Sequence, residues 1–309
     1  MDFFDLHCDT LTTAMQHSAD LTEKNLHIHF PINEEIKRHC QCFAIYCPDT
    51  IRNEDAFNYY TMSKHYFKRE LAAFPEYFEQ VHTAEDIDKI TAAGKTAAVL
   101  TVEGGAVLNG KTENLSTLYN DGVKMMTLTW NGDNELGCGQ LNPEKGLTPF
   151  GLDVIREMER MGMVIDVSHL SDEGVCDVLK TVSVPIAASH SNVRSVCGSM
   201  RNLTDEQFIE IVHRKGIVGI NFYKYFLNND GDHAAICDMA RHIRHMLKLG
   251  GENVIAMGGD FDGCEVVDGI NDINDVPKLY SALSAEGIPE NILDKIFWKN
   301  AQSFFERMI

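Results

Sequence analysis

Short apolar runs alternate along this chain with longer segments in which apolar residues recur every three to four positions. The runs are four to seven residues long, as in Ala97–Val102 and Ile217–Asn221. Such runs suit strands that are buried on both faces of a parallel sheet. The longer segments are typical of amphipathic helices that cover a sheet with one apolar face. The alternation therefore predicts a series of βα units.

Eight runs are predicted as strands: Phe3–Leu6, Cys42–Tyr46, Ala97–Val102, Lys124–Thr129, Met163–Val167, Pro185–Ser189, Ile217–Asn221 and Val254–Met257. The clearest helices between them are predicted at Ala56–Ala73, Phe150–Met161, Asp172–Lys180, Asp205–Lys215 and His233–Leu249. Thr204 and Gln207 have the spacing of a capping box at the start of one of these helices. Eight strands with intervening helices predict an α/β fold, a (β/α)8 barrel, whose catalytic residues gather at the C-terminal strand ends.

Three segments do not fit this alternation. Residues 21–40 and 131–149 are polar and irregular, and long loops of this kind tend to form lids or pocket walls. Residues 289–309 are predicted to form an amphipathic helix on the outside of the barrel. No segment resembles a linker, so residues 1–309 are expected to form one domain.

Composition narrows the classes of function. The chain has 27 basic and 46 acidic residues and a net charge of −19, which argues against a nucleic-acid surface and against binding to anionic membranes. No stretch approaches the roughly 20 apolar residues of a membrane span, and no signal peptide is apparent at the N-terminus, so a cytoplasmic protein is expected. Nine cysteines without a CxxC pair do not indicate a disulfide framework.

The first predicted strand ends on residues that suit a metal ion. His7 and Asp9 are two positions apart, so in an extended strand their side chains lie on the same face. An imidazole and a carboxylate in this arrangement can chelate a zinc-like ion at about 2.0–2.2 Å. Taken alone, the pair is more typical of a strand end with two solvated polar residues.

Other strands also end on ligand-type residues: Glu103, His169, His190, Asp260 and Asp262. Each has a simpler explanation by itself, as a surface histidine, a helix-end charge or a turn aspartate. Their joint placement at one end of a barrel predicts a hydrolytic metal site. A catalytic zinc takes about three protein ligands, so His7, Asp9, His169 and His190 with a bridging Glu103 would serve two ions. Two ions about 3.5–4 Å apart can hold a hydroxide and polarise a substrate carbonyl.

These residues resemble the membrane (renal) dipeptidases, a family of binuclear zinc peptidases on a (β/α)8 barrel. The resemblance is carried by Asp5-Leu-His-Cys-Asp9, Val102-Glu-Gly-Gly105, Asp166-Val-Ser-His169, Ser189-His-Ser191, Ser195-Val-Cys-Gly-Ser-Met-Arg-Asn202, Asn221-Phe-Tyr223 and Gly258-Gly-Asp-Phe-Asp-Gly263. The matching stretches keep a consistent order from residue 5 to residue 263, which makes the set specific.

The resemblance implies a role for each matching residue. His7 and Asp9 would hold one Zn²⁺, His169 and His190 the other, and Glu103 would bridge them. Arg201 would bind the C-terminal carboxylate of a dipeptide, Asp260 would be the catalytic acid and base, and Tyr223 would line the substrate pocket. The implied reaction is hydrolysis of a dipeptide by a metal-bridging hydroxide, with Glu103 and Asp260 as catalytic residues. A homodimer is also expected from the resemblance.

The sequence departs from the family after the fourth predicted strand. Many members have a histidine there that is thought to stabilise the tetrahedral intermediate, whereas this chain has Trp130 and Asn131. An indole N–H can donate one hydrogen bond but cannot accept a proton. We therefore expect Trp130 and Asn131 to contact the substrate, and we expect Asn131 or Asn134, rather than the indole, to support the intermediate.

Two other functions are also compatible with the sequence. The first is another metal-dependent hydrolase on the same barrel, acting on a cyclic amide, lactone or phosphoester. Such enzymes commonly start with His-x-His and use a lysine carbamate as bridge, which differs from His7-Cys8-Asp9 and Glu103 here. The second is a catalytically silent relative that binds a small peptide or a metal, and Trp130 is the feature that favours it. The sequence leaves open which dipeptides are cleaved, whether D-residues are accepted and which metal is bound in the cell.

Overall fold

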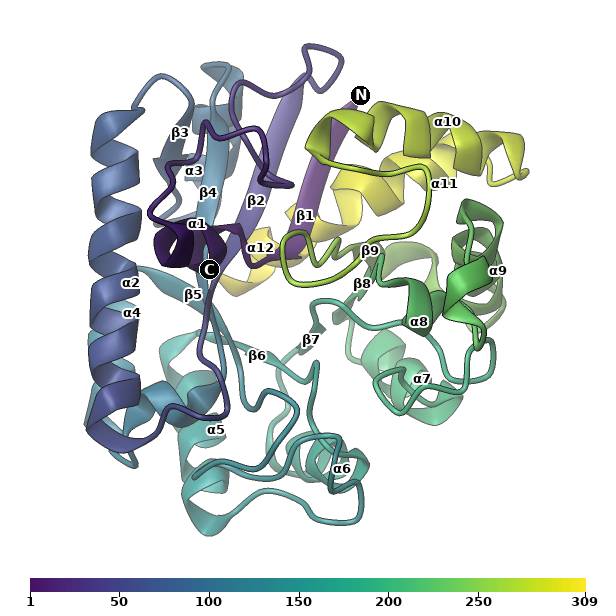
Figure 1. Cartoon of the computed structure of the whole chain (residues 1–309). Helices are drawn as coiled ribbons and strands as arrows, with labels where there is room; N and C mark the ends of the chain where they lie inside the picture. Colours follow the sequence, from purple (N-terminus) through teal and green to yellow (C-terminus); the bar gives the residue numbers. More distant parts are fainter.

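Eight parallel strands close into a barrel in the computed structural model, which describes all 309 residues (Figure 1). Neighbouring strands follow the order β2-β1-β9-β8-β7-β6-β5-β4, and pairing of β4 with β2 closes the ring. The barrel strands are β1 (Asp2–Cys8), β2 (Arg38–Tyr46), β4 (Thr96–Glu103), β5 (Val123–Thr127), β6 (Val164–Asp166), β7 (Ala187–Ala188), β8 (Ile217–Ile220) and β9 (Ile255–Met257). The predicted (β/α)8 barrel is confirmed, and each predicted strand matches one of these eight.

A ninth strand, β3 (Phe78–Gln80), was not predicted. It pairs only with the first residues of β4, at Thr96–Ala98, and so lies beside the barrel. Three residues are too few to show a period in the sequence, which is why the pattern did not reveal this strand.

Helices surround the barrel between the strands. They are α1 (Thr10–His17), α2 (Asn53–Ala73), α3 (Ala84–Ala92), α4 (Glu113–Asn120), α5 (Pro149–Met161), α6 (Asp172–Thr181), α7 (Asp205–His213), α8 (Lys224–Leu227), α9 (Ile236–Lys248), α10 (Val276–Ala285), α11 (Glu290–Asp294) and α12 (Asn300–Met308). The five predicted helices are present, and α7 begins with the predicted capping box, in which Gln207 N donates to Thr204 Oγ1 at 3.2 Å and Thr204 N to Gln207 Oε1 at 2.9 Å. No helix combines the length and apolar composition that crossing a bilayer requires.

The C-terminal tail is helical, as predicted, but its predicted position outside the barrel is wrong. A π-helical turn at Lys295–Lys299 joins α11 to α12. The buried tail residues Trp298, Ala301, Phe304 and Phe305 belong to the cluster that also contains inward-facing residues of all eight barrel strands. Phe4 of β1 contacts two of them, with ring centroids 5.7 Å from Trp298 and 5.2 Å from Phe305. The tail therefore closes the N-terminal end of the barrel, and we call these four residues the barrel floor.

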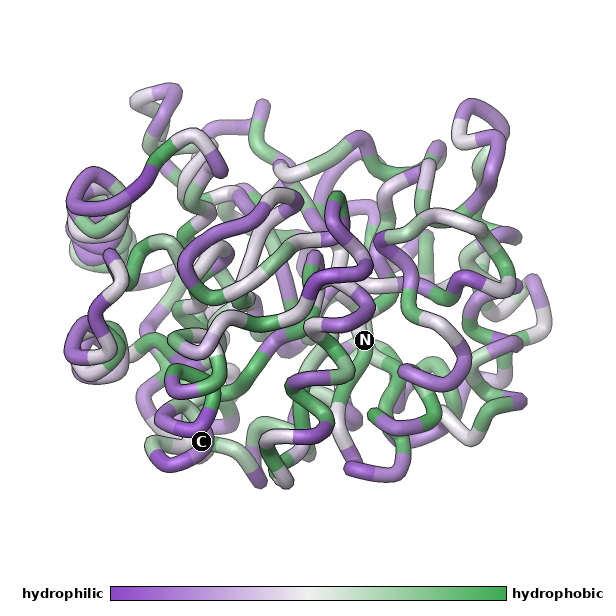
Figure 2. The backbone as a smooth tube through the Cα atoms, turned by 90° about the horizontal axis from the view of Figure 1, so that it is seen from below, coloured by the Kyte–Doolittle hydropathy of each residue, from purple (hydrophilic) through white to green (hydrophobic).

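The opposite end of the barrel, its mouth, is bordered by long loops. Residues 19–37 and 128–148 contain no helix or strand, which confirms the two irregular segments expected from the sequence. In Figure 2 hydrophobic and hydrophilic stretches alternate along the backbone, and the loops at the outer edge of the view are largely hydrophilic. The mouth is thus formed by polar loops and by the ends of the strands.

Candidate metal centre

The ends of β1 and β9 bring together His7, Asp9 and Asp260. His7 Nε2 lies 3.6 Å from Asp9 Oδ2 and 4.0 Å from Asp260 Oδ1. Two backbone hydrogen bonds join these distant parts of the chain: Asp260 N donates to His7 O at 3.1 Å, and Asp9 N donates to Phe261 O at 2.8 Å. All three side chains are buried. The two strand ends thus form one rigid, acidic half of a cluster.

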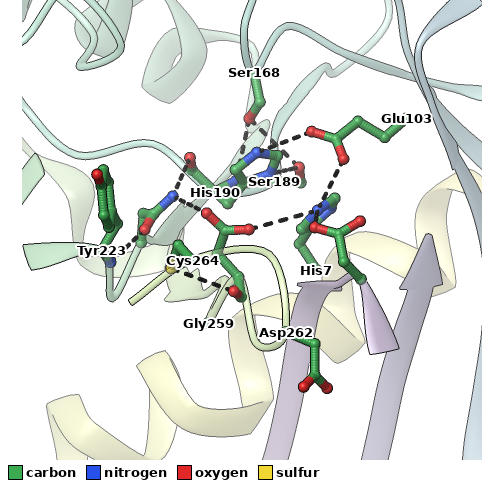
Figure 3. A network of polar contacts seen from close by, with 12 residues as sticks. His7, Glu103, Ser168, Ser189, His190, Tyr223, Gly259, Asp262 and Cys264 are labelled. Carbon is green, nitrogen blue, oxygen red and sulfur yellow. Dashed lines mark hydrogen bonds and ion pairs between the residues drawn. The ribbon is translucent and has the colours of Figure 1, made fainter. Parts of the chain in front are cut away.

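Glu103, the last residue of β4, lies between the two halves of this cluster. Its Oε2 is 3.5 Å from His7 Nε2. Its Oε1 is 2.9 Å from His169 Nε2 and 3.6 Å from His190 Nε2. Figure 3 shows the carboxylate with one oxygen directed to His7 and the other to His190. This is the arrangement that a bridging carboxylate needs.

The second half contains the two remaining histidines, which follow β6 and β7. The Nε2 atoms of His169 and His190 are 2.9 Å apart. His169 has a positive φ of 67°, an uncommon conformation for a residue with a Cβ, and this conformation places its ring at the mouth. Both Nε2 atoms and Glu103 Oε1 therefore converge on one point.

The residues fit divalent metal ions. His7, Glu103 and His190, and separately His7, Asp9 and Asp260, have ligand atoms within 4.8 Å of one another. His7 Nε2 and Asp9 Oδ1 are buried without a hydrogen-bond partner, a costly arrangement unless a further group binds there. Imidazole nitrogens and carboxylate oxygens are ligands of zinc. The five ligand residues predicted from the sequence are therefore brought together.

The charges of the cluster differ between its halves. Burial lowers the pKa of His7, but the carboxylates of Glu103 and Asp9 outweigh it and raise this pKa well above its usual range. Burial lowers the pKa values of His169 and His190 well below that range. Burial, with the nearby Asp9, raises the pKa of Glu103 to about 7. The acidic half thus attracts a cation, while the histidine half offers neutral nitrogens.

A buried relay orients His190. Ser189 Oγ lies 2.7 Å from His190 Nδ1 and donates to Asp166 Oδ2. Because the hydroxyl proton goes to Asp166, Nδ1 of His190 donates to Ser189 and Nε2 keeps its lone pair for a metal. The roles of Ser189 and Asp166 were not predicted from the sequence, although both belong to the stretches that carry the family resemblance.

Arg201 is buried beside the cluster without a carboxylate partner. The residue is 5% exposed and forms no ion pair with a carboxylate. Nη2 donates to the carbonyl of His190 at 3.4 Å, Nε has no partner, and the guanidinium lies 5.3 Å from the ring centre of Phe226. Burial lowers its pKa to about 10. The charge of this group is therefore incompletely compensated within the protein.

Asp260 is held in a fixed position at the same mouth. It has a φ of 57°, and its Oδ2 accepts a hydrogen bond of 3.0 Å from Asn221 Nδ2. Asn221 in turn accepts a hydrogen bond from the backbone N of Tyr223 at 2.6 Å. Burial raises the pKa of Asp260, which suits a group that exchanges protons.

Asp262 does not join the cluster but holds neighbouring loops together. Its carboxylate accepts hydrogen bonds from Thr10 Oγ1 at 2.5 Å and from the backbone N of His27 at 2.8 Å. It therefore anchors the irregular segment 19–37 to the loop that carries Asp260.

A cavity of about 680 Å³ opens over the cluster. Asp9, Glu103, His169 and Asp260 form its inner end, and its walls include Tyr46, Trp130, Asn131 and Tyr223. Trp130 lies edge-on to Tyr46, with ring centroids 5.2 Å apart. Sequence analysis missed Tyr46, which the barrel places here because it ends β2 in register with Glu103.

Asn134 lies elsewhere. Its Nδ2 donates to Leu128 O and its Oδ1 accepts from Leu136 N, both at 2.8 Å, and it does not line the cavity. Of the two amides considered as donors to an intermediate, only Asn131 is placed to meet a substrate.

Comparisons with known proteins agree with this geometry. A family model described as membrane dipeptidase (peptidase family M19) matches residues 1–308. A Klebsiella pneumoniae protein, described as an uncharacterized protein in the pqqA 5′ region, is 33% identical over 71% of this chain and 84% of its own length. A protein named dipeptidase tcpJ from Claviceps purpurea is 28% identical over 75% of this chain and 56% of its own length. The crystal structure of a Rhodobacter sphaeroides metallo peptidase, liganded with a phosphinate mimic of the dipeptide L-Ala-D-Ala, superposes with a TM-score of 0.93 at 26% identity, over 100% of this chain and 99% of that one.

Proposed function

The chain belongs to the membrane dipeptidase family and is a metallo-dipeptidase, a hydrolase that acts on peptide bonds; from this premise we propose that it is a two-zinc enzyme that cleaves dipeptides with a free C-terminal carboxylate. The observation that carries the proposal is the buried Arg201, which has no carboxylate partner and lies beside a cluster whose central carboxylate faces both halves.

The metal ions would be held by the residues that converge at the mouth. His7 and Asp9 would hold one ion, His169 and His190 the other, and Glu103 would give one oxygen to each. Two zinc ions bound there would supply a hydroxide nucleophile at neutral pH and would polarise the scissile carbonyl. The number of ions is supported by the two separate directions in which Glu103 Oε1 and Oε2 point.

Arg201 would bind the C-terminal carboxylate of the substrate. A guanidinium can pair with both oxygens of a carboxylate, and here its Nε has no partner in the protein. The ion pair would compensate the buried charge of Arg201, which has no carboxylate partner within the protein. This contact places the scissile bond of a dipeptide, rather than that of a longer peptide, over the cluster.

Asp260 would move the proton during hydrolysis. Its raised pKa makes the carboxyl group able to take a proton from the nucleophile and deliver it to the leaving amine. Asn221 holds Oδ2 at 3.0 Å, which leaves Oδ1 directed toward the cluster, 4.0 Å from His7 Nε2.

The intermediate would be supported by the side-chain amide of Asn131, which lines the cavity. Trp130 and Tyr223 would act as walls that contact the substrate. The Rhodobacter protein binds a mimic of L-Ala-D-Ala, so we include dipeptides with a D-residue at the C-terminal position among the substrates proposed for this chain.

The test compares free and C-terminally amidated dipeptides, in L,L and L,D forms, on zinc-loaded protein. Removing one partner of a buried charge pair typically costs about 2–5 kcal/mol, so wild type should strongly prefer the free acids. Arg201→Ala should lose kcat/KM for the free acids by a factor on the order of 10²–10³ and should lose the preference itself.

Arg194 provides the matched control. It belongs to the same segment and pairs with both oxygens of Asp172 at 2.8 and 2.9 Å, so its charge is already compensated. Arg194→Ala should keep the preference for free acids. Equal wild-type rates on free and amidated dipeptides would refute the role of Arg201.

A further inference from the structure

Asn131 contacts a predicted metal ligand from behind. Its Oδ1 lies 2.9 Å from Nδ1 of His169 and accepts a second hydrogen bond from Gln140 Nε2 at 3.2 Å. A carbonyl oxygen only accepts hydrogen bonds, so Nδ1 of His169 must carry the ring proton. The lone pair of the imidazole then lies on Nε2, which faces Glu103 Oε1 at 2.9 Å.

The loop that follows Asn131 is built around this contact. Gln140 N donates to the carbonyl of His169 at 2.9 Å, and Leu141 N donates to the carbonyl of Asn131 at 3.2 Å. Gly139 pairs with Leu170 in an isolated bridge. A Cβ on Gly139 would lie 2.3 Å from the carbonyl oxygen of Asn131, so glycine is required for this approach. Both the backbone and the side chain of Gln140 thus connect Asn131 to His169.

The two histidines of the second half therefore have different supports. His190 is held from within the barrel by Ser189 and Asp166. His169 lies three residues beyond the end of β6, and its Nδ1 contacts Asn131 of the loop after β5 instead. Segment 131–149, which fits no βα unit, supplies the missing hydrogen-bond acceptor.

We propose that Asn131, held in place by Gln140, is the positioning residue of His169 and determines how tightly the second metal ion is bound. The proposal rests on the proposed function, because it requires His169 to be a metal ligand. It explains why a long irregular loop crosses the mouth at this place: the loop fixes the tautomer and the ring orientation of one ligand. Loss of an outer-shell partner of a metal-bound histidine typically costs about 10–100-fold in metal affinity.

The experiment measures zinc binding to metal-free protein by competition with a chromophoric chelator. Asn131→Ala should weaken the second equivalent of zinc about 10–100-fold and leave the first within a few-fold of wild type. Asn131→Asp retains the acceptor oxygen and should bind both equivalents about as tightly as wild type. Gln140→Leu should weaken the second equivalent by a smaller factor.

Asn142→Ala is the matched control within the same loop. The Asn142 side chain donates to Asp133 on the surface at 2.7 Å and touches no ligand, so zinc binding should not change. Wild-type affinity in Asn131→Ala would overturn the proposal, and so would equal losses in the Asp and Ala variants, since the acceptor would then be irrelevant.

A second measurement separates this proposal from the proposed function. The ¹⁵N shifts of the His169 ring in metal-free protein report which nitrogen carries the proton. Wild type and Asn131→Asp should show the proton on Nδ1, and Asn131→Ala should shift it toward Nε2. If wild type binds no zinc, the proposed function fails; if the proton of wild-type His169 is on Nε2, the positioning role fails, whatever the metal content.

Discussion

The two ends of the barrel are filled in opposite ways. The floor contains Trp298, Ala301, Phe304 and Phe305, which belong to one buried apolar cluster with residues of all eight barrel strands. The mouth contains buried acids and histidines with unpartnered atoms, such as His7 Nε2 and Asp9 Oδ1. One strand reaches both ends, because Phe4 of β1 packs on the floor and His7 of the same strand lies at the mouth.

This difference shows where the fold gains stability and where it loses it. Burying aromatic side chains contributes favourable free energy, whereas burying carboxylates that lack partners costs free energy. The pKa of about 7 for Glu103 reflects this cost, because burial disfavours its charged form. The floor must therefore offset a mouth that is unfavourable until cations bind there. Substitutions at the mouth should therefore change metal binding, whereas substitutions at the floor should change the free energy of unfolding.

The largest effect is expected for Glu103→Gln at the mouth. The neutral amide removes the charge that faces both halves, so the affinity of both zinc sites should fall by more than the roughly 100-fold that loss of an outer-shell partner can cost. Turnover should fall with it. Metal analysis of zinc-reconstituted protein should give about two equivalents for wild type and far fewer for the variant.

The same experiment tests the number of ions. A wild-type content that stays at one equivalent or none would exclude the two-zinc centre. Loss of a single equivalent in Glu103→Gln would show that the carboxylate serves one ion alone.

The next largest effect is expected for Phe305→Ala at the floor. Truncating a fully buried phenylalanine typically costs about 3–5 kcal/mol of unfolding free energy, and Phe305 is fully buried against Phe4. Chemical denaturation should show this loss, while the zinc content per folded molecule stays at the wild-type value. Met62→Ala is the control, because Met62 is 61% exposed on α2 and its truncation should have little effect on either quantity. A loss of zinc in folded Phe305→Ala would mean that the two ends are not independent.

The sequence predicted the mouth better than the floor. Each predicted ligand follows an apolar strand run, and in a parallel barrel the ends of such runs must meet, so five distant residues could be placed together from the sequence alone. The tail had a helical period, but the period does not tell which surface its apolar face covers. Only the packing of Phe4 against Trp298 and Phe305 shows that it closes the barrel.

The residues that hold the predicted metal ligands in place could not be predicted from the sequence. Asn131 and His169 are 38 positions apart, and their contact depends on the course of an irregular loop. Ser189 precedes His190 directly, but a serine beside a histidine is common, and the role of Asp166 depends on β6 and β7 being neighbours. Hydrogen bonds between loops carry no period, so pattern analysis cannot detect them.

A smaller effect, on the pH dependence of the stability of metal-free protein, should distinguish the mouth from the floor. In metal-free protein the pKa of Glu103 is raised from 4.5 to about 7. Between these values the unfolded chain has released the proton that the folded chain keeps, so this group makes stability fall as pH rises from about 4.5 to 7. Glu103→Gln lacks the group, and its melting temperature should exceed that of metal-free wild type by a difference that grows over this range.

Phe305→Ala, the floor variant, is the comparison for this measurement of melting temperature against pH. Phe305→Ala removes no ionisable group, so its deficit relative to metal-free wild type should be nearly constant between pH 4.5 and 7. A Glu103→Gln difference that stays flat, or that shrinks as pH rises, would contradict the view that charge burial at the mouth costs stability.

The smallest effect is expected at Trp130, which belongs to the mouth but resembles the floor in its chemistry. Its indole lies edge-on to Tyr46 and 6.2 Å from the ring centre of His169, so it packs as an aromatic wall. Trp130→Phe keeps a wall and deletes only the N–H, and one hydrogen bond contributes about 0.5–1.5 kcal/mol, so kcat should change by less than about tenfold with zinc content unchanged. Abolished turnover at full zinc content would instead identify the indole as the donor to the intermediate, an effect on the order of 10²–10³ in kcat. Trp130→His, which introduces the residue found in many family members, should raise kcat if the departure limits catalysis. An unchanged kcat in both variants would assign the whole of that support to Asn131.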